Sequence, residues 1–492
     1  MTQRQQSTQG GTSAQHRVAG GGRYEVHLDA AAQAQRTPEV EITPRPFQLA
    51  VFGDLSGGDA ESPGPLRPLR IDRDDLNEVL SRLNPTVSMA WGQTGAPVAA
   101  SFDSIWDFEP AELLDRMRLF QDLRARIDGG QAGRSGSEDH SPPAPRGSAL
   151  LEDVLSASGA EEPRPSASSG GDALQDLIDQ ALAPHLVKSD PGQAERRAMF
   201  ESSAQDILRR ILRDPGFRAL ESLWRGVDLL CRRLETGPDL KIYVIDLPKE
   251  RLARELRASE GGAESALTRL LLDPHGPGAG FSVLVGCYAF DAGDEDLSIL
   301  SALGDLGSLA NAPWILEAAP DLAQLALETS VGDSDTEGAW SDLRASVAAR
   351  FLSLVLPRVL LRLPYAPENG SEPPFFRETE GDLGHGDFLW GSPAILVGLV
   401  LAQGFLDHGW DLRPAAPDDV GGLPFHVTTE HGETRAQPCA EVLITESEAR
   451  RMIEAGLTPV VAFRDQDRVK LLGVHPIADT PFPLAGPWLD RG

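Results

Sequence analysis

The sequence contains little cysteine, and its three cysteines lie far apart. Cys231, Cys287 and Cys439 form no CxxC pair, which argues against a cysteine-ligated metal cluster and against a disulfide framework. A chain of 492 residues with so few thiols is typical of a reducing compartment, so we expect a cytoplasmic protein.

Long hydrophobic runs are also absent. The one strongly apolar stretch, Phe388 to Phe405, carries Ser392, Pro393 and Gln403, whereas a membrane span needs about 20 apolar residues. We therefore predict a buried helix there and no membrane insertion. The polar, Gly-rich residues 1–22 have no apolar core, so we do not expect a secretory signal.

Positive charge is scarce, and the formal net charge is -29. This balance argues against binding to nucleic acid or to anionic membranes, and it favours a basic partner. No Lys or Arg occurs between Phe290 and Leu343. The acidic residues there form either solvated faces or a patch that meets a basic partner. The candidates for such a patch are Asp294, Glu295, Asp296, Asp333 and Asp335.

Motifs that carry chemistry are missing as well. The sequence has no GxxxxGK[ST], no HExxH, no GxSxG and no clustered Cys/His spacing. Carboxylate pairs are so abundant that none stands out as an acid and base. We therefore predict no catalytic residue, no metal site and no cofactor, although a hydrolase with an acidic cleft remains an alternative.

Composition divides the chain into four parts. Stretches rich in Gly, Ser, Pro and Ala are typical of linkers. We predict a disordered tail over residues 1–22, a small module over 23–128, a flexible linker with a short helix (Leu150 to Leu155) over 129–171, and a large module over 172–492.

The small module begins with an apolar strand that ends in a turn, over Phe47 to Gly57. A helix over Ile71 to Pro85 follows, and Asp72 or Asp74 can cap it. The segment Asp107 to Asp128 has an apolar stripe at helical spacing. This stripe packs either on its own module or on another subunit.

The large module alternates helices and strands. It opens with helices over residues 194–213 and 217–234, followed by a strand over Leu240 to Leu247 that is apolar on both faces. Strands over residues 281–290 and 313–319, with a helix after Asp296 between them, extend this order. The pattern predicts an α/β fold with mixed sheets.

Arginines interrupt the apolar segment from Trp340 to Tyr365. We predict a helix that Pro357 ends. Since an unpaired buried guanidinium is costly, Arg344, Arg350, Arg358 and Arg362 should pair with carboxylates.

Several of these segments resemble the sheath proteins of type VI secretion systems. RPFQLAVFGDLSG, IDRDDLNEVLSRLNP and SFDSIWDFEPAELLDRM resemble the small subunit, VipA or TssB. The segments that resemble the large subunit, VipB or TssC, are DPGFRALESLWRGVDLL, LKIYVIDLPKERL, LPRVLLRLPY, FLWGSP and GGLPFHV. These blocks contain the motif residues Trp224, Arg225, Arg344, Arg358, Arg362 and Trp390.

This resemblance implies a phage-tail-sheath-like fold in which a small α/β module is linked to a larger one. It also implies a helical tube of identical subunits that surrounds an inner tube of Hcp and contracts on a baseplate. Neighbouring subunits of the family exchange strands, for which Tyr24, Val26 and Leu28 are candidates here. The family usually keeps its two subunits as separate chains, and the small module here is shortened after Asp128. Recognition by the disassembly ATPase ClpV is therefore left open, as is an alternative role in a released phage-tail-like particle.

Overall fold

A computed structural model describes residues 45–58, 64–91, 96–129, 192–260, 265–273, 275–276, 278–328, 335–381, 383–430, 433–479 and 482–489. The described residues all belong to one compact unit, Arg45–Gly492. Tyr24 to Leu28, Leu150 to Leu155 and Asp333 lie outside the described residues, as do the predicted tail and nearly all of the predicted linker.

Helices make up much of this unit. The α-helices are α1 (Leu76–Leu83), α2 (Pro110–Arg116), α3 (Arg118–Gly129), α6 (Gln193–Arg213), α7 (Pro215–Arg233), α8 (Lys249–Glu260), α9 (Ala266–Leu272), α10 (Asp294–Ala310), α11 (Pro320–Glu328), α12 (Asp335–Ala345), α13 (Ala394–His408) and α14 (Glu446–Glu454). The 3-10 turns include η1 (Ile105–Phe108) and η3 (Ala348–Phe351).

The strands form one large sheet and three hairpin-like pairs. They are β1 (Phe47–Gly53), β2 (Leu69–Ile71), β3 (Thr86–Trp91), β4 (Ala96–Ser101), β5 (Leu240–Asp246), β6 (Val283–Phe290), β7 (Trp314–Ala318), β8 (Leu352–Leu356), β9 (Val359–Arg362), β10 (Leu389–Gly391), β11 (Asp418–Val420), β12 (His426–Glu430), β13 (Glu433–Gln437), β14 (Leu457–Ala462) and β15 (Val469–Leu471). The large sheet has nine strands in the order β11-β15-β14-β8-β7-β6-β1-β5-β2. Its inner strands are parallel and its outer strands β2, β15 and β11 antiparallel, which confirms the predicted mixed α/β fold.

Strand β1, from the predicted small module, lies inside the sheet of the predicted large module. It pairs in parallel with β5, where Phe47 lies opposite Leu240, and with β6, where Leu49 lies opposite Val283. Residues on both of its faces are buried, since Leu49 and Val51 enter one core while Ala50 and Phe52 enter the other. A strand that is apolar on both faces needs helices on both sides and strands along both edges. The large module provides most of these neighbours, so the two predicted modules share one sheet.

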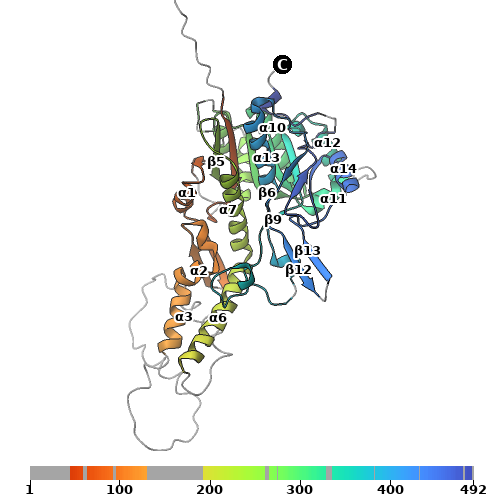
Figure 1. The fold of residues 1–492 in the computed structure, drawn as a ribbon. Helices are drawn as coiled ribbons and strands as arrows, with labels where there is room; N and C mark the ends of the chain where they lie inside the picture. The colour runs from red at the N-terminus through yellow and green to blue at the C-terminus, as the bar shows by residue number, and fades with distance from the viewer. Residues whose placement is uncertain are drawn as a thin grey trace, which may run out of the picture. The chain divides into compact units, whose positions relative to one another are not determined.

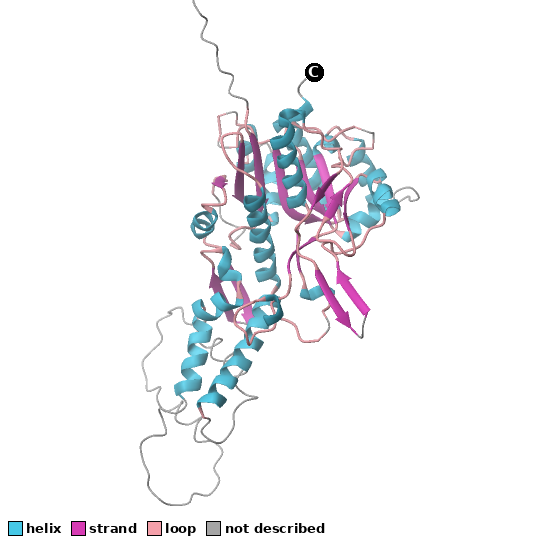
Figure 2. Ribbon diagram, in the orientation of Figure 1, coloured by secondary structure: helices cyan, strands magenta, loops and turns pink. Residues whose placement is uncertain are grey.

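Helices cover both faces of the sheet and complete three layers. Helices α7 and α13 pack on one face, and α8 to α12 pack on the other (Figure 1). The β12–β13 hairpin lies away from the nine-stranded sheet (Figure 2). The apolar stripe on α2 and α3 joins the first of these cores through Leu113, Phe120 and Leu123. That stripe therefore packs within its own chain.

Three local predictions were wrong. Trp340 to Tyr365 is not one helix ended by Pro357, because α12 stops at Ala345 and LSLVL forms the fully buried strand β8. Short apolar runs of this kind do not distinguish a buried strand from a buried helix. Helix α1 has Asp75 at its N-cap with no side-chain cap bond, whereas Asp72 accepts hydrogen bonds from the backbone of the preceding turn. The predicted helix over residues 107–128 breaks at Met117, which adopts an extended backbone conformation.

The apolar run from Phe388 to Phe405 is buried as predicted, but it forms two elements. β10 covers its start, and α13 begins after Pro393, the helix N-cap. Most of α13 is buried between the sheet and α7. Its apolar composition is therefore explained by burial on all sides.

The shared sheet makes a direct prediction about cleavage. If a protease site is inserted between residues 129 and 192 and cut, we expect the two fragments to elute together from a sizing column, because β1 stays hydrogen-bonded between β5 and β6. A matched chain with Val51→Asp should give fragments that separate or aggregate, since a buried unpaired carboxylate is costly. Separation of the cut wild-type chain in native buffer would contradict the shared sheet.

Candidate functional site

The turn after β1 connects the N-terminal segment to the rest of the sheet. The side chain of Asp246, at the end of β5, accepts hydrogen bonds from Leu55 N at 2.9 Å, Ser56 N at 3.1 Å and Ser56 Oγ at 2.7 Å. Ser56 O accepts from Thr86 N at 2.8 Å. The DLSG segment is therefore a bridge between β1, β5 and β3.

Gly57 closes this turn in a conformation that other residues rarely adopt. Its φ is +59°, and a Cβ atom would lie 2.2 Å from Thr86 O. Gly370 has a similar φ of +73° with nothing within 4 Å of a Cβ. Alanine substitutions at these two glycines therefore separate the cost of backbone strain from the cost of steric overlap.

We predict that Gly57→Ala lowers the free energy of unfolding by about 2 kcal/mol more than Gly370→Ala, because only Gly57 adds an overlap of the overpacking kind. Urea unfolding of both variants measures the difference. Equal losses would show that the turn relaxes away from Thr86.

Trp224 links the same turn to α7. Its side chain is fully buried, and its Nε1 donates to Leu55 O at 3.0 Å. The LESLWRG block, predicted to be structural, thus contacts the DLSG block directly. This contact spans 169 positions in the sequence.

Glu221 and Arg225, on either side of Trp224 in α7, belong to a buried charge network. We call it the Arg362 cluster, and its members are Glu221, Arg225, Arg362, Tyr365 and Glu378. Arg362 donates to both oxygens of Glu221, at 2.6 and 2.9 Å, and to Glu378 at 2.8 Å. Arg225 donates to Glu221 at 2.8 Å and to Tyr365 Oη at 2.7 Å. Glu378 also accepts from Tyr365 N at 2.8 Å. Every charge in this cluster has an opposite partner, as a buried network requires.

Burial and the charges within the Arg362 cluster shift the pKa values of its members. The pKa of Glu221 is lowered: burial acts to raise it, but the guanidinium groups of Arg362 and Arg225 outweigh burial. Burial raises the pKa of Tyr365, so its hydroxyl stays neutral and binds Arg225. Arg362 is therefore paired with carboxylates inside the fold, as predicted, and the motif residue Arg225 joins the same network. Glu378, in the segment Phe375 to Glu380, was not among the predicted residues; Arg362 lies only 16 positions before it, but acidic residues are so abundant in this chain that none stands out as the partner.

The other predicted arginines have different partners. Arg358 forms a two-bond pair with Glu441, at 2.8 and 2.6 Å, and His385 lies 2.7 Å from the same carboxylate. Arg344 lies 3.0 Å from Asp479 and donates to Ile477 O at 2.9 Å. The guanidinium of Arg350 lies over the ring of Phe482, at 4.5 Å, and forms no ion pair among the described residues. The prediction of carboxylate partners is confirmed for Arg344, Arg358 and Arg362, and it is wrong for Arg350.

Trp390 lies beside His385 at the edge of this region. Its Nε1 donates to His385 O at 3.0 Å, and the two rings stack with centroids 5.6 Å apart. Trp390 belongs to the FLWGSP segment and His385 to the GHGDF segment. The fold brings His385 next to Glu441.

The acidic candidates of the 290–343 segment divide into two groups. Asp294 and Glu295 are exposed at the start of α10, and Glu295 lies 3.1 Å from Arg257. Asp296 is buried, where it pairs with Lys249 at 2.7 Å and accepts from Asp291 N at 2.7 Å. Its role is therefore inside the fold and not on a partner surface. Asp335 begins α12, and its side chain lies outside the described residues.

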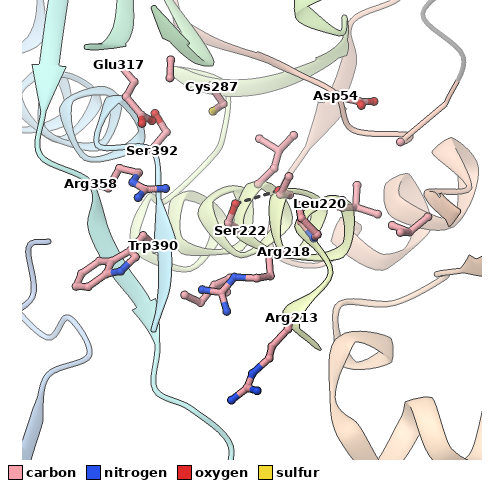
Figure 3. Close-up of a pocket in the computed structure, with 18 of the residues that line it drawn as sticks. Asp54, Arg213, Arg218, Leu220, Ser222, Cys287, Glu317, Arg358, Trp390 and Ser392 are labelled. Carbon is pink, nitrogen blue, oxygen red and sulfur yellow. Dashed lines mark hydrogen bonds between the residues drawn. The ribbon is translucent and has the colours of Figure 1, made fainter. Parts of the chain in front are cut away.

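A pocket of about 780 Å³ opens where the central parallel strands end (Figure 3). Its lining from the sheet edge comprises Asp54 after β1, Cys287 and Ala289 of β6, Glu317 of β7 and Arg358 after β8. The facing wall is formed by Arg213 at the end of α6 and by Arg218, Ala219 and Ser222 of α7. The pocket therefore has the carboxyl groups of Asp54 and Glu317 together with Arg358 at the sheet, and the two arginines Arg213 and Arg218 on the facing side.

Burial shifts the pKa values of groups in this pocket. Burial, with a smaller contribution from the nearby Asp246, raises the pKa of Asp54 to about 6. Burial also raises the pKa of Glu317, while Arg358 partly offsets this effect. The pKa of the Cys287 thiol is raised by its burial, so the thiol stays protonated and is a poor nucleophile.

Comparison with known proteins agrees with the two sets of blocks. Residues 23–126 match the family described as type VI secretion system, VipA, VC_A0107 or Hcp2. Residues 197–477, more than half of the chain, match the family described as EvpB/VC_A0108, tail sheath N-terminal domain, or VipB. The chain belongs to the type VI secretion sheath family.

The resemblance read from the sequence is thus confirmed: VipA-like and VipB-like regions are fused in one chain. Over 284 residues the chain is 26% identical to the type VI secretion system sheath protein TssC1 of Pseudomonas aeruginosa. This similarity covers 54% of the chain and 57% of TssC1, so the chain spans little more than half of that relative's length. The family is one of structural sheath proteins.

The described residues also show no features of membrane-spanning helices or of clustered metal ligands. In the part of the chain that the structure describes, none of the helices has the length and apolarity needed to cross a membrane. Within the same residues, no group of three or more His, Cys, Asp and Glu side chains is placed to hold a metal ion.

Proposed function

We propose that this protein is a non-catalytic, cytoplasmic subunit of a contractile sheath, which polymerises into a helical tube around an inner tube of Hcp and contracts to propel it. The observation that carries the proposal is the combination of a VipA-like and a VipB-like region in one chain, with β1 of the first hydrogen-bonded between β5 and β6 of the second. Such a chain carries the two parts in a fixed one-to-one ratio. Repeated heterologous contacts between identical blocks generate a helix.

Strand exchange is our proposal for the link between subunits. Tyr24, Val26 and Leu28 alternate with polar residues, as a strand with one apolar face does. Such a strand can pair with a sheet edge of the neighbouring copy, where backbone hydrogen bonds supply the affinity. β2 and β11 form the two edges of the described sheet, so each has one side that is not paired with another strand of that sheet and that an added strand could take.

The exposed acidic residues are our candidates for the inner-tube face. Asp294 and Glu295 remain on the surface, together with Asp305, Asp321 and Asp342. The segment that contains these carboxylates, between Phe290 and Leu343, has no Lys or Arg of its own. A basic inner-tube surface would be attracted by them, and complementary charge favours encounter and register.

Electron microscopy of the purified chain, alone and with Hcp, tests the proposal. We expect hollow helical tubes and co-sedimentation of Hcp with them. Deleting residues 23–28 should abolish the tubes, whereas Asp294→Asn with Glu295→Gln should keep the tubes and weaken Hcp retention. A concentrated chain that stays monomeric with Hcp and baseplate components present would overturn the proposed function.

A released phage-tail-like particle would use the same kind of sheath. The similarity to a protein named for type VI secretion favours the secretion sheath. Fractionation decides between them, since a secretion sheath stays with the cells while a released particle is recovered from the medium after lysis.

A further inference from the structure

The pocket lies at the point where the chain order of the sheet reverses. From β1 the parallel strands β6, β7 and β8 follow one another on one side, while β5 lies on the other side. The connection into β5 passes through α7 on one face, and the connection from β5 to β6 passes through α8 and α9 on the opposite face. In open α/β sheets, the crevice beyond the carboxyl ends of the strands at such a switch point is where ligands bind. A volume of about 780 Å³ lies within the usual range for ligand pockets.

The basic wall of the pocket contains a guanidinium without a direct ion pair in the described part of the chain, that of Arg218, although Glu378, Glu221 and Asp387 act on it from a greater distance. In the Arg362 cluster, the two guanidinium groups of Arg225 and Arg362 balance the two carboxylates of Glu221 and Glu378. Arg218 lies beside this cluster, where burial and Arg362 lower its pKa. Its guanidinium donates to Phe388 O but has no carboxylate at ion-pair distance among the described residues. The nearby carboxylate of Asp387 is shared with Arg213, at 3.5 Å.

A partly buried guanidinium without a counter-charge is costly, and an anion at its open side would remove that cost. Figure 3 shows Arg218 and Arg213 on the same side of the pocket, where α6 ends and α7 begins. The amino end of α7 is already capped by Asp214, which accepts from Phe217 N at 2.9 Å, so the positive charge on this side comes from the two arginines. Arginine also suits planar, two-bond recognition of carboxylate and phosphate groups.

We propose that this pocket is a binding site for a small anionic ligand, whose carboxylate or phosphate group is held by Arg218 and Arg213. The opposite wall presents the carboxyl groups of Asp54 and Glu317 (Figure 3). The remainder of the ligand therefore carries hydrogen-bond donors, such as amino or hydroxyl groups, toward the sheet. Trp390 and Ile395 provide apolar surface between the two walls.

Isothermal titration of the full chain with two probes, inorganic phosphate and L-glutamate, tests the site at constant ionic strength. We expect at least one probe to bind with a dissociation constant of about 1 mM or tighter, which corresponds to about -4 kcal/mol. Phosphate binding alone identifies a phosphate site, and glutamate binding identifies a carboxylate site.

Two variants and a control make the result specific. Arg218→Gln should weaken binding at least about tenfold. Ala219→Trp should block binding by filling the pocket, since Ala219 is exposed on its α7 wall and its replacement removes no charge. If Arg218→Gln does not fold, Ala219→Trp decides. Arg257→Gln, which changes an arginine that lines no part of this pocket, should bind as the wild type does.

The site is rejected if neither probe binds at about 10 mM, a concentration at which a 1 mM site would be nearly filled. It is also rejected if the folded Arg218 and Ala219 variants bind as tightly as the wild type. Both outcomes are independent of tube formation, because they can be read on protein that assembles and on protein that does not.

Discussion

Replacing Arg362 with methionine is expected to lower the free energy of unfolding by about 3–5 kcal/mol. Arg362 is 8% exposed and is the shared partner of Glu221 and Glu378, which are almost fully buried. Methionine keeps much of the side-chain volume but removes the charge. Two buried carboxylates then remain, with only Arg225 to compensate them. Urea or guanidinium unfolding of the full chain measures the loss.

The matched control is Arg257→Met, which breaks an exposed pair with Glu295. Exposed pairs of this kind contribute about 0–1 kcal/mol, so this variant should unfold close to the wild type. A triple variant, Arg362→Met with Glu221→Gln and Glu378→Gln, should recover part of the loss because no buried carboxylate is left unpaired. If Arg362→Met and Arg257→Met cost the same, the Arg362 cluster does not stabilise the fold.

The same cluster shows what the sequence could and could not predict. An apolar segment interrupted by arginines predicts buried ion pairs, because a lone buried guanidinium is too costly. The partners could not be named, because Glu221 and Arg362 lie 141 positions apart and acidic residues are abundant throughout the chain. The sequence did not distinguish Arg350 from the other arginines, because its contact is the aromatic ring of Phe482 and not a carboxylate.

Strands and helices were predicted where periodicity and length agreed. α6, α7, β5 and β6 appear within about three residues of their predicted limits. The strand LSLVL was predicted as helix because a five-residue run with four apolar residues fits a buried strand and a buried helix equally well. The place of β1 between β5 and β6 was not predicted either, since both its neighbours come from the region beyond the predicted linker. Strand order depends on which edges are left to fill, and a local pattern does not contain that information.

The pocket was missed for a related reason. Its acidic and basic residues follow β1 and β8, lie near the end of β7, end α6 or lie in α7, so no short motif contains them. Parallel strands bring their carboxyl ends to one edge, and only the strand order shows which of these ends are adjacent. A sequence argument can therefore name the types of residue at strand ends but not the site that they form.

Trp224→Ala is expected to cost about 3–5 kcal/mol of unfolding free energy. Trp224 is fully buried between the DLSG turn and α7, and its Nε1 donates to Leu55 O at 3.0 Å. Alanine removes most of a large side chain, leaves a cavity and leaves the Leu55 carbonyl without this donor. Since this turn directly follows β1, the loss should also weaken the attachment of the VipA-like region.

Two variants separate packing from hydrogen bonding. Trp224→Phe keeps much of the apolar volume but loses the donor, so it should cost less than Trp224→Ala, with about 1–3 kcal/mol from the unpartnered carbonyl. Trp106→Ala is the control, because Trp106 is 53% exposed and its removal should change stability by less than about 1 kcal/mol. In the chain cut between residues 129 and 192, Trp224→Ala should release the N-terminal fragment at a lower urea concentration than the cut wild type. Release at the same urea concentration would show that β1 is held by its strand neighbours alone and that the contact between the two blocks contributes nothing to their association.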